Sequence, residues 1–101
     1  MIVSTITKNN TIIITLPGSF NFLDQAIFRK SYESQLNGKN KNYILDFRRV
    51  KFIDSSSLGM ILLLNDYVSD TIKNKITLLN ANPEVLHIFK VANFQQLFHI
   101  K

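Results

Sequence analysis

The 101-residue chain contains no cysteine, which excludes several classes of protein at once. Without a thiol there is no disulfide framework, no thiolate metal site and no cysteine nucleophile. A disulfide-stabilised secreted protein is therefore excluded, and we expect a cytoplasmic one. The chain also has only three glycines and two prolines, while 46% of its residues are hydrophobic and eight are phenylalanine. This composition indicates a packed globule and not a disordered tail.

Long apolar runs are absent as well. No stretch reaches the roughly 18 apolar residues needed to span a bilayer. The first residues, Met1 to Thr5, lack the charged start and the continuous apolar run of a signal peptide. We therefore expect no insertion into a membrane. The length predicts one domain, residues 1–101, which buries about 60–68% of the surface that its unfolded chain exposes.

Positive charge exceeds negative charge, with a formal net charge of +5 and a pI near 9.7. Much of the excess falls between the first and second expected helices, at Arg29, Lys30, Lys39, Lys41, Arg48, Arg49 and Lys51. A basic segment raises the question of nucleic acid. However, the charges are not interleaved with aromatic residues, and no zinc-finger, RRM or KH motif is present. A solvated surface or an acidic protein partner is the favoured interpretation, without direct binding of nucleic acid.

Motifs for catalysis and for cofactor binding are also missing. His87 and His99 lie on different expected elements, and neither begins a metal-ligand pattern. Ser55 lacks the Gly-x-Ser-x-Gly elbow of a serine nucleophile. The three glycines are far apart and form neither a P-loop nor a dinucleotide fingerprint. We therefore expect a protein that is not an enzyme, with no catalytic residue, no metal and no cofactor.

The first third of the chain predicts a hairpin followed by a helix. Residues 2–7 and 11–16 are rich in β-branched side chains, and the asparagines between them tolerate the positive φ of a tight turn. Pro17-Gly18 ends the second strand. Helical spacing over residues 23–36 then places Leu23, Ile27, Tyr32 and Leu36 on one side, with Ala26 and Phe28 beside them. Gly38 can supply the left-handed stop of this helix.

The rest of the chain alternates strands and helices. Residues 43–47 and 75–79 have the composition of strands, and residues 97–100 can close the sheet. A second helix is expected over residues 55–72. Its segment 58–64 is apolar almost all round, so we expect it to be pressed between the sheet and another element, with Gly59 permitting close backbone approach. A third helix begins at Pro83, after Asn82, with an apolar stripe of Val85, Leu86, Ile88, Phe89 and Val91.

This order of elements predicts an α/β fold. The expected sheet is mixed, with four to five strands, and begins with an antiparallel hairpin. The later strands are parallel and joined by right-handed helical crossovers, which gives three or four helices.

The junction between the third strand and the second helix carries the most chemical information. There Asp54 can accept a hydrogen bond from the amide of Ser56 or Ser57 and so cap the helix, and Ser55 falls on its first turn. Taken alone, the motif is explained by such a cap, and Asp46 by the end of a strand. However, the free amides and the positive dipole end of a helix also favour a phosphoryl group at this position.

Four segments of the chain resemble the STAS domain family, and in particular the anti-sigma factor antagonists. The most specific is Val50-Lys51-Phe52-Ile53-Asp54-Ser55-Ser56-Ser57-Leu58-Gly59, which is similar to the family's signature of strand, Asp-Ser, small residue and Leu-Gly. Residues 16–22 resemble the family's glycine-containing turn into its first helix, residues 43–47 its central strand, and residues 82–85 through 98–100 its last helix and strand.

The resemblance implies a site. Ser55 matches the family's phosphoacceptor, with Asp54, Ser56 and Ser57 around it and with Ser56 and Ser57 as lesser candidate acceptors. Relatives commonly have glycine where this chain has Ser57. The turn of Phe20, Asn21 and Phe22, whose aromatic side chains we expect to be exposed, lies on the same side as the phosphosite in the family. These three residues, together with Leu58 and Gly59, are therefore candidate partner contacts, although core packing or a hydrophobic staple also explains the two aromatics.

The resemblance also implies a function. The unphosphorylated protein would bind an anti-sigma factor or a related serine kinase, phosphorylation of Ser55 would end that binding, and a PP2C-type phosphatase would restore it. Such partner switching serves signal transduction and transcription regulation in bacteria. The alternative is an accessory STAS subunit bound permanently to the ATPase of a phospholipid ABC transporter, without a phosphorylation switch.

Overall fold

The computed structural model describes residues 4–8, 10–33, 42–68 and 75–101. They form a five-stranded sheet in the order β1-β2-β3-β4-β5, so each strand pairs with the next one along the chain. The strands are β1 (Ser4–Lys8), β2 (Thr11–Thr15), β3 (Asn42–Asp46), β4 (Thr77–Leu79) and β5 (His99–Ile100). β1 is antiparallel to β2, and the other neighbours are parallel. The predicted mixed sheet with its opening hairpin is confirmed.

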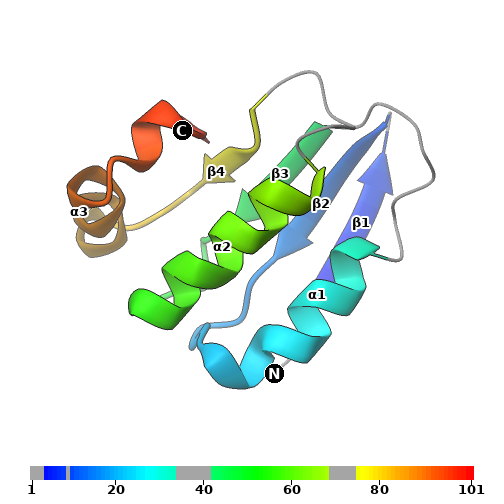
Figure 1. The fold of residues 1–101 in the computed structure, drawn as a ribbon, viewed down its shortest axis with the longest axis horizontal. Coiled ribbons are helices and arrows are strands. Elements are labelled where there is room, and N and C mark those ends of the chain that lie inside the picture. Colours follow the sequence, from blue (N-terminus) through cyan, green and yellow to red (C-terminus); the bar gives the residue numbers. More distant parts are fainter. Residues whose placement is uncertain (1–3, 9, 34–41, 69–74) are drawn as a thin grey trace.

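Three α-helices connect the parallel strands. They are α1 (Gln25–Glu33), α2 (Ser55–Val68) and α3 (Pro83–Val91), and two 3-10 turns accompany them, η1 (Phe22–Asp24) before α1 and η2 (Phe94–Gln96) after α3. In Figure 1, α2 crosses the middle of the sheet, with α1 on one side of it and α3 on the other. The predicted order of strands and helices is confirmed.

The burial of strand residues alternates, which shows that the helices cover one face of the sheet. Ile12 and Ile14 of β2 are fully buried, whereas Ile13 between them is half-buried. In β3, Leu45 is buried and its neighbour Ile44 is half-buried. Because successive side chains point to opposite faces of a strand, the buried set faces the helices and the half-buried set lies on the other face.

Aromatic side chains fill the core in two groups. Beneath α1, Phe28 packs edge-on against Phe20 and Tyr32, with ring centroids 5.1 and 5.3 Å apart. The second group lies beneath α3 and η2 and consists of Phe47, Phe89, Phe94 and Phe98, with centroids 4.9–5.5 Å apart. Such pairs add about 0.5–1.5 kcal/mol each to the free energy of burial.

Asparagine occupies the tight turns, and it also begins α3. Asn10, Asn80 and Asn93 all have φ near +60°, at 63°, 63° and 60°. The hairpin turn at Asn10 is the predicted one. The Asn82 side chain accepts a hydrogen bond of 2.8 Å from the amide of Val85, so the predicted start of the third helix at Pro83 is confirmed.

The predicted apolar stripe of the first helix is confirmed at Tyr32 and wrong at Leu23 and Ile27. Leu23 and Ile27 are 87% and 44% exposed, while the buried side chains are Phe28 and Tyr32. Leu23 lies in the 3-10 turn η1, which Asn21 caps, so it does not follow the helical period of α1. The predicted end of this helix at Leu36 and Gly38 lies outside the described residues.

Three further expectations need correction. Segment 58–64 of α2 is not enclosed on all sides, because Leu62 and Leu63 are 37% and 53% exposed. β4 begins at Thr77 and not at residue 75. The final strand is restricted to His99–Ile100, because the turn η2 occupies the chain just before it. The predicted extension of the second helix from Val68 to Ile72 lies beyond the described part.

Across the described ranges, every helix is too short or too polar to pass through a membrane.

Candidate functional site

Two loops meet beyond the carboxyl ends of β2 and β3. One is residues 16–22, which leads into η1, and the other is residues 47–54, which leads into α2. The amide of Lys51 donates a hydrogen bond of 3.0 Å to the carbonyl of Gly18, and Ser19 and Phe52 form an isolated parallel bridge. The two loops are thus joined by backbone contacts, and they bring the Ser55–Ser57 cluster next to the turn that carries Phe22.

Ser57 is a buried structural residue. Its side chain has no exposed surface, and its hydroxyl donates a hydrogen bond of 2.6 Å to the carbonyl of Phe20 in the other loop. The same oxygen accepts a hydrogen bond of 3.2 Å from the amide of Asp54. Because its hydroxyl is enclosed and engaged, Ser57 is the least accessible of the three candidate phosphoacceptors.

Asp54 caps α2 as predicted. Its Oδ1 accepts a hydrogen bond of 3.0 Å from the amide of Ser57 and one of 2.6 Å from the hydroxyl of Ser56. The pKa of Asp54 is lowered mainly by the hydrogen bond from the Ser56 side chain, followed in size by the one from the Ser57 amide. Ser56 is half-buried, and its hydroxyl is already hydrogen-bonded to the capping Asp54. It is therefore a poorer candidate phosphoacceptor than a serine with a free hydroxyl.

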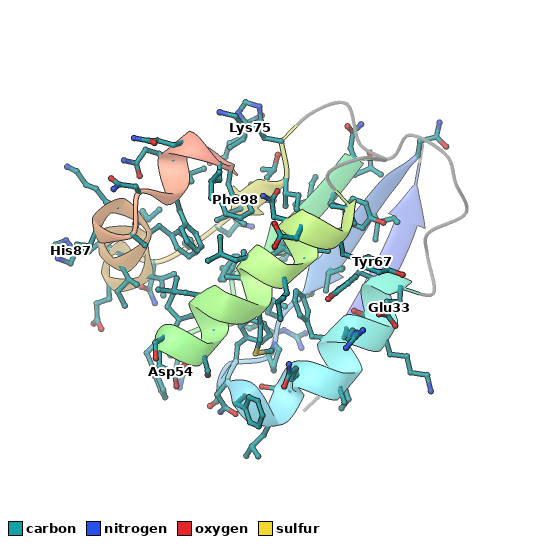
Figure 2. All side chains as sticks on the ribbon, in the orientation of Figure 1. Glu33, Asp54, Tyr67, Lys75, His87 and Phe98 are labelled. Atoms are coloured by element: carbon teal, nitrogen blue, oxygen red, sulfur yellow. The ribbon has the colours of Figure 1, made fainter. Side chains whose placement is uncertain are left out.

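Ser55 differs from both of its neighbours. It is exposed, it is the first residue of α2, and its side chain has no hydrogen-bond partner within the described part of the chain. Figure 2 shows the adjacent Asp54 at the outer end of α2. A group added to Ser55 therefore meets solvent and the positive end of the helix without disturbing the core.

A salt bridge fixes the beginning of the loop that leads to Ser55. Asp46 is buried at the end of β3, and its Oδ2 lies 2.7 Å from Nη2 of Arg48. Burial raises the pKa of Asp46, but the hydrogen bonds from Arg48 and Asn80 outweigh it, and the pKa is lowered overall. Asp46 thus ends β3, as the sequence predicts, and it also anchors the loop that follows.

An apolar groove of about 400 Å³ runs between η1 and α2. It is lined by Phe22, Gln25, Ser56, Gly59, Met60, Leu62, Leu63 and Asp66. Phe22 is 63% exposed, so its ring can contact a partner at one side of the groove. On the α2 side of the groove, the exposed side chain of Leu63 can do the same. The groove therefore begins beside the serine cluster and follows α2 away from it.

The remaining candidate contacts fall in different environments. Phe20 is 1% exposed and packs on Phe28, so its expected exposure is wrong. Asn21 is half-buried and caps η1 by accepting a hydrogen bond of 2.9 Å from the amide of Leu23. Leu58 is half-buried against the core. Only Phe22 and Gly59 of the candidate partner contacts line the groove.

Gly59 does not allow the close backbone approach that its place in the sequence predicts. A Cβ built at this position meets no atom within 4 Å, because the groove lies beside it. The expected contact is therefore wrong.

Two features of the site were not predicted: the burial of Ser57 and the exposure of Leu62 and Leu63. Only the first had a signal in the sequence. The buried residues of α2 are Ser57, Met60, Ile61, Leu64 and Val68, a series at helical spacing. Ser57 falls on that stripe, so its burial follows from the period of the helix. The exposure of Leu62 and Leu63 has no comparable signal, because every residue of segment 58–64 except Gly59 is large and apolar.

Potential metal ligands are dispersed over the described ranges. These ranges contain no cluster of three or more His, Asp or Glu side chains that could hold a metal ion. His87 and His99 are both exposed and lie on different elements, α3 and β5.

Comparisons with known proteins identify related sequences. A family model of the STAS domain matches residues 3–101. A STAS-domain containing protein of Pseudomonas aeruginosa is 39% identical over 87 residues, which cover 86% of this chain and 84% of that protein.

Solved structures share the fold at lower identity. A candidate anti-sigma factor antagonist from Thermotoga maritima has a TM-score of 0.83 and 22% identity, covering 97% of this chain and 84% of its own. The anti-sigma factor antagonist SpoIIAA in its unphosphorylated form has a TM-score of 0.67 and 21% identity, covering 98% and 86%. Part of the murine Slc26a9 anion transporter matches with a TM-score of 0.68 and 20% identity, covering 94% of this chain but 16% of that one.

Proposed function

Because the chain belongs to the STAS domain family, we propose that it is a partner-switching regulator of the anti-sigma factor antagonist type. In its unphosphorylated form it binds an anti-sigma factor or a related serine kinase. Phosphorylation of Ser55 ends that binding, and a PP2C-type phosphatase restores it. The protein acts by binding and not by catalysis, and it needs no cofactor.

The observation that carries this proposal is the difference between three adjacent serines. Ser55 is exposed with a free hydroxyl, Ser56 is bonded to Asp54, and Ser57 is buried against the carbonyl of Phe20. Only the first of these can receive a phosphate without breaking a hydrogen bond that the structure describes. A phosphate there adds a charge of about −1.5 to −2 at neutral pH.

The apolar groove supports a partner surface next to that charge. Phe22 and Leu63 expose large apolar side chains along it, and Ser56 lines the end nearest to Ser55. A partner that fills the groove therefore covers the first turn of α2. Placing an uncompensated negative charge under a docked acidic or apolar surface costs several kcal/mol, which suffices to release it.

The test compares wild type with Ser55→Ala, Ser55→Asp and the control Ser56→Ala. Phosphopeptide mapping of protein isolated from its own cells should find phosphate on Ser55 and none on the Ser55→Ala protein, with Ser56→Ala still modified. Titration of the purified partner should show binding by wild type and Ser55→Ala and loss of binding by Ser55→Asp. Phosphate confined to another residue contradicts the proposal.

The accessory transporter subunit is separated by the same titration. Binding of a permanent ABC-transporter subunit to its ATPase would not depend on phosphorylation of Ser55. The ATPase would therefore bind wild type and Ser55→Asp equally well, and the protein from cells would carry no phosphate at that residue.

A further inference from the structure

A second hollow lies at the opposite end of the sheet from the serine cluster. It has a volume of about 290 Å³ and is lined by Thr11, Asn42, Ile44, Lys75, Thr77, His99 and Lys101. These residues belong to the starts of β2, β3, β4 and β5 and to the chain next to β4 and β5. Figure 2 shows Lys75 above the start of β4 and Asp54 far from it, at the other end of the molecule.

The hollow lies on the face of the sheet that the helices leave uncovered. Ile44 and Thr77 are direct register partners and are both half-buried, whereas Tyr43 and Leu78 beside them are buried under the helices. Thr77 in turn pairs with His99. The side chains of neighbouring parallel strands therefore converge on one patch of the open face.

The described lining of the hollow is rich in donors, includes two lysines and contains no aspartate or glutamate. Lys75 and Lys101 are exposed, and within the described ranges neither forms an ion pair; His99 also contributes to the lining. Thr11 and Thr77 add hydroxyls. The register also places Lys8 opposite Thr11 at the same end of the sheet.

We propose that this hollow, which we call the cationic hollow, binds a small anion of the phosphate type. Lysine ammonium groups and threonine hydroxyls are donors that suit phosphate oxygens. The volume is close to the lower limit of small-molecule sites, roughly 300 Å³. The ligand is therefore a phosphate or a compact phosphate monoester. The inference is independent of the proposed switch at Ser55.

The experiment follows backbone amide signals by NMR while inorganic phosphate is added at constant ionic strength. The expected result is a saturable shift of the Thr11, Thr77, His99 and Lys101 amides. The double variant Lys75→Ala/Lys101→Ala should lose about tenfold or more in affinity, since two charge-assisted contacts disappear. The control Lys30→Ala/Lys90→Ala removes the same charge from α1 and α3 and should bind as wild type does.

Two further arms identify the source of the phosphate. Tighter saturable binding of glycerol phosphate than of inorganic phosphate assigns a soluble monoester. Binding to vesicles containing phosphatidic acid, but not to neutral vesicles, assigns a lipid headgroup. Either result supports the cationic hollow if the Lys75→Ala/Lys101→Ala variant loses it.

Three results overturn the proposal. The first is the absence of saturable shifts in every arm. The second is an equal loss of affinity in the Lys30→Ala/Lys90→Ala control, which indicates attraction to net charge alone. The third is a shift confined to the amides of Ser56 and Ser57, which places the anion at the start of α2 instead.

Discussion

Replacing Ser57 with alanine tests the most specific contact between the two loops of the site. The substitution removes one oxygen that donates to the carbonyl of Phe20 at 2.6 Å and accepts from the amide of Asp54 at 3.2 Å. The residue is fully buried, so water does not readily replace either partner. The Asp54 side chain still caps the Ser57 amide, so α2 itself should form.

The expected loss follows from leaving buried polar groups without partners. A buried carbonyl or amide that loses its hydrogen bond costs about 1–3 kcal/mol. Since the contact to Phe20 is buried and the one to Asp54 is partly buried, we expect Ser57→Ala to lower the free energy of unfolding by about 2–3 kcal/mol. For a domain of this size that corresponds to a fall in Tm of about 8 °C or more.

The neighbouring serines supply matched controls. Ser55→Ala removes an exposed hydroxyl with no described partner and should change stability by no more than about 0.5 kcal/mol. Urea unfolding followed by circular dichroism measures both variants under the same conditions. If Ser57→Ala is as stable as Ser55→Ala, then Ser57 does not join the two loops, and the argument that separates the three serines fails.

Two other substitutions have expected outcomes that thermal or urea unfolding can check. Gly59→Ala should stabilise the protein by up to about 1 kcal/mol, because the added methyl meets no atom within 4 Å and alanine favours a helix; a fall in Tm would contradict the open position beside the groove. Hydrogen bonds from Ser56 and Ser57 hold the pKa of Asp54 below its ordinary value of 3.8. The stabilisation that these hydrogen bonds give to the ionised carboxylate is therefore present above pH 3.8 and is lost as the pH falls through the lowered pKa. Wild type should therefore be more stable than Asp54→Asn near neutral pH and should lose that advantage in strong acid, whereas a difference independent of pH would show that the charge of Asp54 does not matter.

The features predicted correctly from the sequence depend on signals within a few residues. The hairpin follows from β-branched runs around Asn10, and the start of α3 from Asn82 followed by Pro83. The cap at Asp54 is local in the same way. Alternation of such segments restricts the topology, because parallel strands need crossovers and these are right-handed.

What could not be predicted depends on contacts between distant segments. Phe20 and Phe22 are the same residue type two positions apart, yet one is 1% and the other 63% exposed. The difference in exposure arises from Phe28, which covers Phe20 but not Phe22, and from the 3-10 turn that begins at Phe22. The cationic hollow was missed for the same reason, because its residues come from four strands and the chain beside them and share no sequence pattern.

The order of strands in the sheet bears on how the protein is made. Since β1 to β5 are neighbours in the order of synthesis, each strand after β1 pairs with a strand that has already been made. The first 68 residues contain three strands, α1, α2 and both loops that meet at Ser57. The last third then adds β4 and β5 to an existing edge and brings Phe89 onto Phe47. The loop that leads to Ser55 is completed only at this stage, because the Asn82 side chain donates hydrogen bonds to the carbonyls of Val50 and Lys51.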